Sequence, residues 1–385
     1  MGKLEFLEAV ATMVGTVVGA GIFGIPYVVS QAGFLTGLLD LLVIGIIVLL
    51  LYLYLGEVVL RTNGKHQLTG YAEKYLGKWG KRLMLFSMIF GIYGALTAYL
   101  LGASSALAGI LGGVQLMYMF LFFMLVSGLV YYGLEAIEKS ELFTMFLIFI
   151  VVILIALFTY PHVKLSNLGS FDVTKFFVPY GVILFAYLGM VAIPEMSEIL
   201  HKEKKKIKNA ILTGMIIPVV IYILFTLIVV GSVGFENFSS LKPDQRIATI
   251  ALGMVVNPSL FIVANLFAVF AMFTSFLALG LALQEMFIYD YNFKKKAAWA
   301  FTCIVPFALA LSGLTTFIYM INLSGIVAGG IDAVLIVLMF HKAKKSGDRK
   351  PEYEIRKSTI LSVIIISFFV IGALFYFFDL LKNLF

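Results

Sequence analysis

Charged residues are scarce in this sequence. Only 13% of its 385 residues are Asp, Glu, Lys or Arg, and 62% are hydrophobic, whereas an average soluble domain is about 25% charged and roughly 45–50% apolar. So little polar surface excludes a water-soluble enzyme, a nucleic-acid binder and a disordered scaffold. The net charge of +7 does not indicate a nucleic-acid partner, because the basic residues form short clusters between apolar runs, as in membrane-protein loops.

Cysteine and histidine are also rare. Cys303 is the single cysteine, so the chain has no internal disulfide and no CxxC pair. The four histidines lie between apolar segments, which argues against a haem or metal centre inside the membrane. The sequence has no GxSxG motif and no cluster of His, Asp or Glu. We therefore expect no catalytic residues and no cofactor other than a coupling ion; an integral membrane enzyme is only the remote alternative.

Long apolar runs are abundant. A helix needs about 20 mostly apolar residues to cross a bilayer, and eleven runs approach or exceed that length. We therefore predict an all-α integral membrane protein of about 11 transmembrane helices, with 1–385 as one transmembrane domain. One run is short and glycines interrupt the next, so ten or twelve crossings remain alternatives. The runs are 5–32, 34–60, 83–107, 113–133, 140–160, 174–199, 209–233, 259–288, 297–313, 315–340 and 358–381.

The distribution of basic residues predicts the orientation. If the N-terminus is cytoplasmic, 23 of the 28 Lys and Arg residues fall in cytoplasmic loops or ends, as the positive-inside rule requires. An odd number of crossings then places the C-terminus outside. We expect a multi-pass protein of the plasma membrane, with the lipid bilayer as its environment and no obligate protein partner.

The first apolar run contains an expected break. Gly15, Gly19, Gly21, Gly24 and Pro26 lie in its middle, although glycine costs about 1 kcal/mol and proline about 3 kcal/mol inside a helix. Backbone released from a helix cannot face lipid, so it must be buried in protein or line a cavity. The alternative is that these glycines only pack helices together, as in GxxxG contacts.

The run 174–199 offers a second break, with Pro179, Gly181, Gly189 and Pro194. Paired interrupted helices at corresponding positions are the best sequence indication of a transporter site. The pairing predicts a first repeat over 5–160, an inverted second repeat over 174–340 and an extra helix at 358–381. Such a 5+5 inverted repeat has its first and sixth helices broken.

One stretch of the first run supports a family resemblance. GTVVGAGIFGIPYVVSQAGF at 15–34 resembles the first membrane helix of the amino acid/auxin permease family, including the hydroxy and aromatic amino acid permeases. That family belongs to the amino acid–polyamine–organocation superfamily. Glu57 with Arg61, FAYLG at 185–189 and the eleven-helix plan are further similarities. The resemblance implies the leucine-transporter-type fold and amino acid transport.

An amino acid is a zwitterion, so its site must satisfy both charges. A broken first helix offers N–H groups for the carboxylate at the start of its second half, where the helix dipole is positive. Freed carbonyls at the end of its first half, with others in the second break, would accept from the ammonium. Aromatic residues would close over the ligand, as in similar transporters, and Tyr93 is a weaker pocket candidate. The predicted substrate-binding residues are Thr16, Val17, Gly19, Ala20, Gly21, Ile22, Phe185, Ala186, Tyr187, Gly189 and Tyr93.

The resemblance also implies a coupling ion. In sodium-coupled members of the fold, two carbonyls of the first helix and a triplet of the eighth hold sodium; here these are Gly15, Val18, Ala271, Thr274 and Ser275. In proton-coupled relatives a lysine in the fifth segment replaces sodium, and this chain has only Lys139 at the edge of that segment. Sodium symport is therefore our prediction, and proton-coupled symport or exchange is the alternative.

Two acidic residues in the apolar runs are candidate gating or supporting groups. Glu57 lies near the cytoplasmic end of the second run, where it either bonds freed backbone or pairs with Arg61. Asp332 lies deeper, in the tenth run. An acid at mid-membrane costs about 2.5–3.5 kcal/mol, so Asp332 is the stronger functional candidate. The sequence as a whole predicts a secondary transporter that imports a small neutral amino acid with sodium by alternating access.

Overall fold

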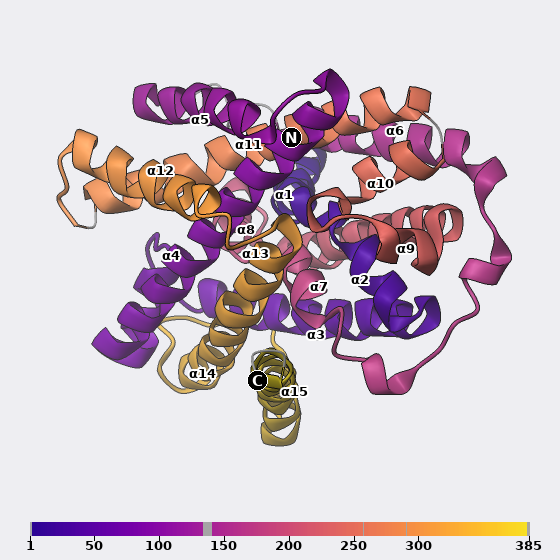
Figure 1. Cartoon of the computed structure of the whole chain (residues 1–385). Helices are drawn as coiled ribbons and strands as arrows, with labels where there is room; N and C mark the ends of the chain where they lie inside the picture. The colour runs from indigo at the N-terminus through magenta and orange to yellow at the C-terminus, as the bar shows by residue number, and fades with distance from the viewer. Residues whose placement is uncertain (1, 134–140, 257, 290, 383–385) are drawn as a thin grey trace.

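The computed structural model describes residues 2–133, 141–256, 258–289 and 291–382. All the regular structure in these residues is helical (Figure 1). The α-helices are α1 (Gly2–Val17), α2 (Ile25–Ala32), α3 (Phe34–Leu60), α4 (Leu68–Leu111), α5 (Gln115–Tyr132), α6 (Glu141–Thr159), α7 (Tyr180–Tyr187), α8 (Ala192–Ile199), α9 (Ile207–Ser240), α10 (Ala248–Val255), α11 (Pro258–Tyr289), α12 (Lys295–Leu311), α13 (Phe317–Ser324), α14 (Gly330–Ser346) and α15 (Thr359–Lys382).

Eight helical stretches of the described residues are long and apolar enough to cross a membrane. They are α3, α4, α5, α7 with α8, α9, α11, α13 with α14, and α15. The other three predicted crossings correspond to α1 with α2, α6, and α12. Of these, α1 and α12 have 16 and 17 residues, and residue 140 lies outside the described residues. The prediction of an all-helical integral membrane protein is confirmed.

The first predicted break is present. Helix α1 ends at Val17, a 3₁₀ turn, η1, covers Ala20–Phe23, and α2 begins at Ile25. Gly19 has an extended backbone, with φ −108° and ψ −153°, and its N–H donates to Val17 O at 2.9 Å. The second half-helix starts later than the predicted position at Ala20–Ile22, because Pro26 lacks an N–H and fits the first turn of a helix.

The second break is also present. Helix α7 ends at Tyr187, and α8 begins at Ala192. Leu188 has an extended conformation, with φ −66° and ψ 117°, and its N–H closes α7 by donating to Phe185 O at 3.0 Å. Figure 1 shows the halves α1, α7 and α8 near the middle of the helix assembly, with α5, α12 and α15 at its periphery.

Other helices depart from regular geometry at glycines. Helix α4 bends at Gly77, whose φ is +75°. Helix α9 bends at Gly234, with φ +76°. A π-helical turn, η8 (Gly325–Gly329), joins α13 to α14 in the run where glycines were expected to interrupt the helix. An added Cβ at Gly325 would lie 2.0 Å from Gly181 O, so this turn packs directly on α7.

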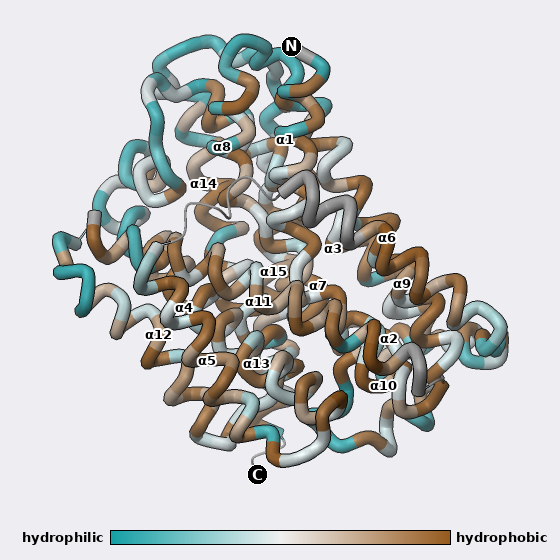
Figure 2. Tube along the Cα trace, turned by 90° about the horizontal axis from the view of Figure 1, so that it is seen from above, coloured by the Kyte–Doolittle hydropathy of each residue, from teal (hydrophilic) through white to brown (hydrophobic). Residues whose placement is uncertain are grey.

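Hydrophilic residues gather at one end of the molecule. In Figure 2 they surround the start of α1, whereas the body of the helix assembly is predominantly hydrophobic. Helix α1 begins at this hydrophilic end and α15 ends at the opposite end (Figure 2). The lysine-rich segments after α8 and α14 belong to the end predicted to be cytoplasmic.

Candidate substrate site at two helix breaks

The two breaks touch each other. A Cβ added to Gly21 would lie 2.7 Å from Ala186 Cα, and one added to Gly189 would lie 2.4 Å from Val17 Cγ2. Only glycine permits so close an approach at these two points. Segments about 165 residues apart in the chain therefore place their interrupted backbones side by side, as the sequence analysis anticipated for a shared site.

A single hydroxyl connects the breaks. Tyr222 of α9 is fully buried, and its hydroxyl oxygen lies 2.8 Å from both Val17 O and Ala186 O. These are two of the carbonyls predicted to accept hydrogen bonds from an ammonium group. They converge on one point, but a tyrosine has one hydroxyl hydrogen and donates to one of them at a time.

A second tyrosine holds the α7–α8 break. Tyr52 of α3 donates to Tyr187 O at 2.6 Å, and its oxygen accepts from Gly189 N at 2.6 Å. The N–H of Gly189, a predicted substrate residue, is therefore occupied. The break has its backbone groups satisfied by a buried side chain, as non-helical backbone within a membrane requires.

The two predicted aromatic lids have different surroundings. The Phe185 ring packs on the first break, since its Cδ1 lies 3.2 Å from an added Gly21 Cβ. The Tyr187 ring is buried against Tyr222, with centroids 5.3 Å apart, and its hydroxyl donates to Leu41 O at 3.3 Å. Only Phe185 therefore faces Gly21. Its carbonyl, predicted to bind the ammonium, is occupied by the Leu188 N–H.

The N–H groups of the η1 turn divide into two kinds. Ala20 and Gly21 open the turn, so they lack intrahelical acceptors as at any helix start. The Ile22 N–H was expected to be available to the substrate carboxylate, but it donates to Gly19 O at 3.4 Å. Thr16 bonds back to its own helix, with its hydroxyl 2.7 Å from Thr12 O.

The space beside the first break is small. A cavity of about 10 Å³ is lined by Val18, Gly19, Ile22 and Ala271 together with phenylalanine side chains. Such a volume holds about one water molecule. Phe23 forms edge-to-face contacts with Phe225 and Phe267 at this cavity, with centroids 6.4 and 5.9 Å apart. The site is closed in this conformation, and the cavity wall is apolar.

Several of the predicted sodium ligands lie at the same break or beside it: Gly15 in α1, Val18 directly after it, and Ala271 and Ser275 on α11. Ser275 Oγ is 3.5 Å from an added Gly19 Cβ, so α11 faces the interruption. The N–H of Gly19 donates to Val17 O and not to Gly15 O, which releases the Gly15 carbonyl from its helical bond. Thr274 has its hydroxyl 3.2 Å from Phe270 O and 3.1 Å from Ala271 O. This is the common back-bonding of threonine in a helix.

Known transport proteins resemble this chain over most of its length. The model of the tryptophan/tyrosine permease family matches residues 3–376. The chain belongs to that family. Glutamine transporter 2 of Aliivibrio fischeri is 25% identical over 81% of this chain and 82% of its own length. The tyrosine-specific transport system 1 of Haemophilus influenzae is 24% identical over 94% and 92%, and the low affinity tryptophan permease of Proteus vulgaris is 24% identical over 73% and 72%.

Membership makes this protein an amino acid permease and a multi-pass membrane protein, and not an enzyme. In the permease, Glu57 does not bond either break. It is fully buried at the end of α3, where Glu57 Oε1 pairs with Arg61 Nε at 2.8 Å and Lys344 Nζ at 2.7 Å. Its Oε2 accepts from Ile355 N at 2.6 Å. Of the two sequence alternatives for Glu57, the structure shows the Arg61 pairing.

Two buried aspartates lie near tyrosines of α3 and α7. Asp332 is 4% exposed, lies beside Ser87 and close to Tyr52, and its Oδ1 has no hydrogen-bond partner among the described residues. Asp40 of α3 is fully buried, and neither of its carboxylate oxygens has a partner in the described part of the permease. Its electrostatic neighbours are Tyr180 and Tyr187.

Tyr93 lies away from the breaks. Its hydroxyl donates to Phe301 O of α12 at 3.0 Å, so it joins α4 to α12 and does not line the space beside η1. Three residues that the sequence analysis did not single out matter more: Tyr52, Tyr222 and Asp40. Asp40 could have been found from the sequence, because it is an acidic residue inside an apolar run. The two tyrosines could not, because the local sequence does not show which group a tyrosine hydroxyl contacts.

Proposed function

We propose that this permease imports a neutral amino acid by alternating access around the two contacting breaks, across the plasma membrane and with its N-terminus in the cytoplasm. The observation that carries this proposal is the convergence of Val17 O and Ala186 O on one hydroxyl, each at 2.8 Å. Two carbonyls that meet at one point suit a donor with several hydrogens. A substrate ammonium is such a donor, and it would replace the Tyr222 hydroxyl between them.

The carboxylate of the same substrate would bind at η1. The N–H groups of Ala20 and Gly21 begin this turn, and the start of a helical turn attracts anions. The missing side chain at Gly19 leaves room beside this turn, whereas the space at Gly21 and Gly189 is taken up by the contact between the two breaks. Phe185 packs against Gly21, so opening of the site requires this ring to move, and its return would cover the ligand.

The surroundings of the breaks favour an uncharged side chain. Phe23, Phe225 and Phe267 form the wall of the cavity beside η1. The named relatives transport glutamine, tyrosine and tryptophan. We therefore propose a neutral amino acid with an aromatic or amide side chain as substrate, which is larger than the sequence analysis expected.

Sodium is the coupling ion in this proposal. The Gly15 and Val18 carbonyls of α1 and its break would supply neutral oxygens to the ion, together with the Ala271 carbonyl and the Thr274 and Ser275 hydroxyls of α11. The contact of Ser275 with Gly19 supports the pairing of these two elements. Thr274 donates its hydroxyl hydrogen to Phe270 O or Ala271 O, which leaves the lone pairs of its oxygen available to the ion.

Proton coupling is a second candidate, favoured by a separate observation. Asp40 and Asp332 both have buried carboxylate oxygens without hydrogen-bond partners in the described residues. An unpaired carboxylate inside a membrane is costly, so such a group is stable when it is protonated. Asp332 lies near Tyr52, which holds the α7–α8 break, and Asp40 lies near Tyr187 at the end of α7. Loss of a proton at either aspartate would affect the site.

The two tyrosines also support an inverted repeat. Tyr52 belongs to α3, the second membrane helix of the proposed first repeat, and Tyr222 belongs to α9, the second of the proposed other repeat. Both use a hydroxyl to hold broken backbone. In this scheme α15 is the additional helix. The two repeats rock against each other around the breaks, so that the site opens first to one side of the membrane and then to the other.

Uptake into proteoliposomes tests the function. The panel is labelled tyrosine, tryptophan, glutamine and alanine, with the sodium and pH gradients set independently. A tenfold sodium gradient with 100 mV across the membrane sustains about a 500-fold accumulation for one coupled ion. We expect accumulation that depends on sodium and that falls strongly in Thr274→Ala with Ser275→Ala. Accumulation indifferent to sodium but abolished by Asp40→Asn or Asp332→Asn would establish the proton alternative instead.

A further inference from the structure

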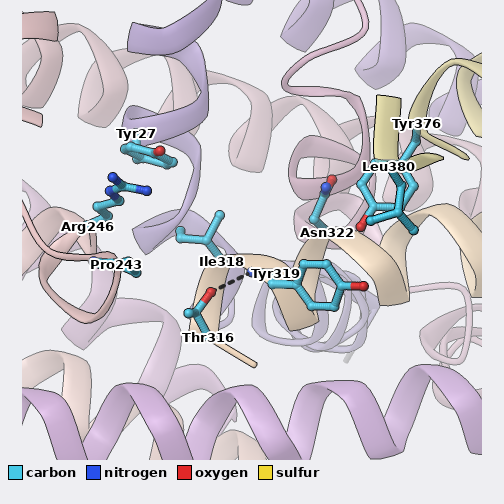
Figure 3. A pocket seen from close by; sticks show the side chains of 9 residues that line it. All are labelled: Tyr27, Pro243, Arg246, Thr316, Ile318, Tyr319, Asn322, Tyr376 and Leu380. Carbon is cyan, nitrogen blue, oxygen red and sulfur yellow. Dashed lines mark hydrogen bonds between the residues drawn. The ribbon is translucent and has the colours of Figure 1, made fainter. Parts of the chain in front are cut away.

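A larger cavity lies at the end of the molecule predicted to face outward. Its volume is about 280 Å³, and it is formed between α2, the loop that contains the 3₁₀ turn η7 (Pro243–Gln245), the start of α13 and the last turns of α15. Figure 3 shows Tyr27 and Arg246 at one end of it and Tyr376 and Leu380 at the other, with α13 between them. The size approaches that of small-ligand sites, which start near 300 Å³.

Arg246 is the charged group of this cavity. Its Nε donates to Leu241 O at 3.2 Å, and its guanidinium lies 5.1 Å from the centroid of the Tyr27 ring, which fixes the head in place. None of the ion pairs within the described residues includes Arg246. A planar guanidinium on an aromatic ring binds a carboxylate through two parallel hydrogen bonds.

The floor of the cavity borders the broken first helix. Ile318 lines the cavity, and an added Cβ at Gly24 would lie 3.3 Å from Ile318 Cδ1 and 2.5 Å from Ile321 Cδ1. Gly24 directly follows the η1 turn. The apolar side chains of Ile318 and Ile321 therefore lie between the cavity and the chain that directly follows the first break.

The remaining lining suits an uncharged side chain. Tyr319, Ile318 and Leu380 line the cavity, and the acidic residues of the described chain contribute nothing to its lining. Asn322 adds an amide at the inner side, where it lies against Gly181 of α7. One cation at the end of an aromatic and apolar cleft selects a molecule with a carboxylate head and an apolar or aromatic body.

We propose that this cavity is an outer docking site, where an amino acid binds through its carboxylate to Arg246 before it moves to the helix breaks. This inference rests on the proposed function for the identity of the ligand. Ile318 and Ile321 form the gate between the two sites, because they fill the space next to Gly24. Arg246 thereby sets the affinity for external substrate without taking part in translocation itself.

Whole-cell uptake separates these roles, because only the outer face is then exposed to substrate. In Arg246→Gln we expect the KM for labelled tyrosine, tryptophan or glutamine to rise about tenfold, with the maximal rate per permease within twofold of the wild type. Arg246→Lys keeps the charge and should show a smaller rise. Lys242→Gln, which removes a cation from the same loop, is the matched control and should change KM less than twofold.

Amine analogues test whether the carboxylate is what Arg246 binds. Tyramine and tryptamine lack that group, so their inhibition of uptake should be equally strong in the wild type and in Arg246→Gln. A KM for Arg246→Gln within twofold of the wild type would overturn the docking site. Equal weakening of amino acid uptake and of amine inhibition would do the same, since it would mean a general distortion.

Thiol labelling gives an independent test that needs no transport. Cys303 is buried, so Thr316→Cys in the cavity introduces the reactive thiol, and Ser239→Cys on the exposed end of α9 is the control. Substrate amino acid should slow labelling at Thr316→Cys at least fivefold, and Arg246→Gln should remove this protection. Absence of protection would refute the docking site, whereas a wild type that transports none of the amino acids would refute the proposed function.

Discussion

At the scale of single residues, Tyr222 has the most consequential contact in the permease. Its hydroxyl is the donor between Val17 O and Ala186 O, in a region where the side chain is completely buried. A buried acceptor that loses its donor costs about 1–3 kcal/mol. The hydroxyl therefore stabilises the closed arrangement of both breaks at once.

Tyr222→Phe should lower the stability of the substrate-free permease by about 1–3 kcal/mol. The reason is that both carbonyls then lose their donor while the ring packing is kept. Thermal unfolding in detergent measures the effect, and saturating substrate should reduce it if an ammonium takes the same place. Tyr132→Phe, at an exposed position on α5, is the control and should leave the unfolding temperature unchanged.

The two carbonyls of this contact were predictable from the sequence, but the tyrosine was not. The glycines and Pro26 predicted freed carbonyls, and Val17 and Ala186 were named for that reason. The tyrosines were not found, because a tyrosine in an apolar run equally suits a core or a membrane interface. Which carbonyl a hydroxyl reaches depends on the packing of α3 and α9 on the breaks, and no local pattern contains that information.

At the scale of elements, the close contact of η1 with α7 limits what the first break tolerates. An added Cβ at Gly21 would meet the backbone of Ala186 at 2.7 Å, so a methyl group must push the two interrupted helices apart. The existence of both breaks was predictable from proline and glycine. The 3₁₀ form of η1 was not, because it depends on this contact with α7.

Gly21→Ala should reduce transport at least tenfold while the protein still reaches the membrane. Gly128→Ala on α5 is the matched control, because an added Cβ there has nothing within 4 Å. Initial uptake rates, normalised to the amount of folded protein by gel filtration, compare the two variants. Equal activity of Gly21→Ala and Gly128→Ala would contradict the close packing of the breaks.

The segment between α14 and α15 is tied to the end of α3. Glu57 binds Arg61, Lys344 and the backbone of Ile355, and Tyr353 donates to Leu53 O at 2.7 Å. The pairing of Glu57 with Arg61 was one alternative that the sequence predicted. Its contacts with Lys344 and Ile355 were not predictable, because these residues are nearly 300 positions away in the chain.

Glu57→Gln should therefore loosen this segment. Breaking a buried ion pair costs about 3–5 kcal/mol, and we expect faster trypsin cleavage at the exposed Arg356 and a lower unfolding temperature. Glu354→Gln removes only the half-exposed partner of Arg61, whose side chain is 50% exposed, and an exposed pair contributes about 0–1 kcal/mol. Cleavage as slow in Glu57→Gln as in Glu354→Gln would show that the buried carboxylate is not the anchor.

At the scale of the whole molecule, the hydrophilic end seen in Figure 2 is the predicted cytoplasmic side. Helix composition was enough to predict the class of protein, and the count of basic residues predicts an orientation that remains to be tested. They were not enough to predict which helices surround the breaks, since the apolar faces of membrane helices are alike in composition.

Thiol labelling of intact cells tests this orientation. Ser239→Cys, at the predicted outer end of α9, should react with a reagent that does not cross membranes. Ser346→Cys, at the end of α14, should react only after the cells are permeabilised. Both serines are exposed and the native cysteine is buried, so the background is low. The opposite pattern would invert the predicted topology.

Tyr222 also has a consequence for which molecules the protein distinguishes. One hydroxyl hydrogen shared by two carbonyl oxygens leaves one of these acceptors without a donor in the resting protein. A primary amine brings three hydrogens and meets that demand, whereas an acylated amine brings one and leaves it as it was. Selectivity for a free α-amino group would thus follow from counting hydrogens, before any shape of the side chain is considered.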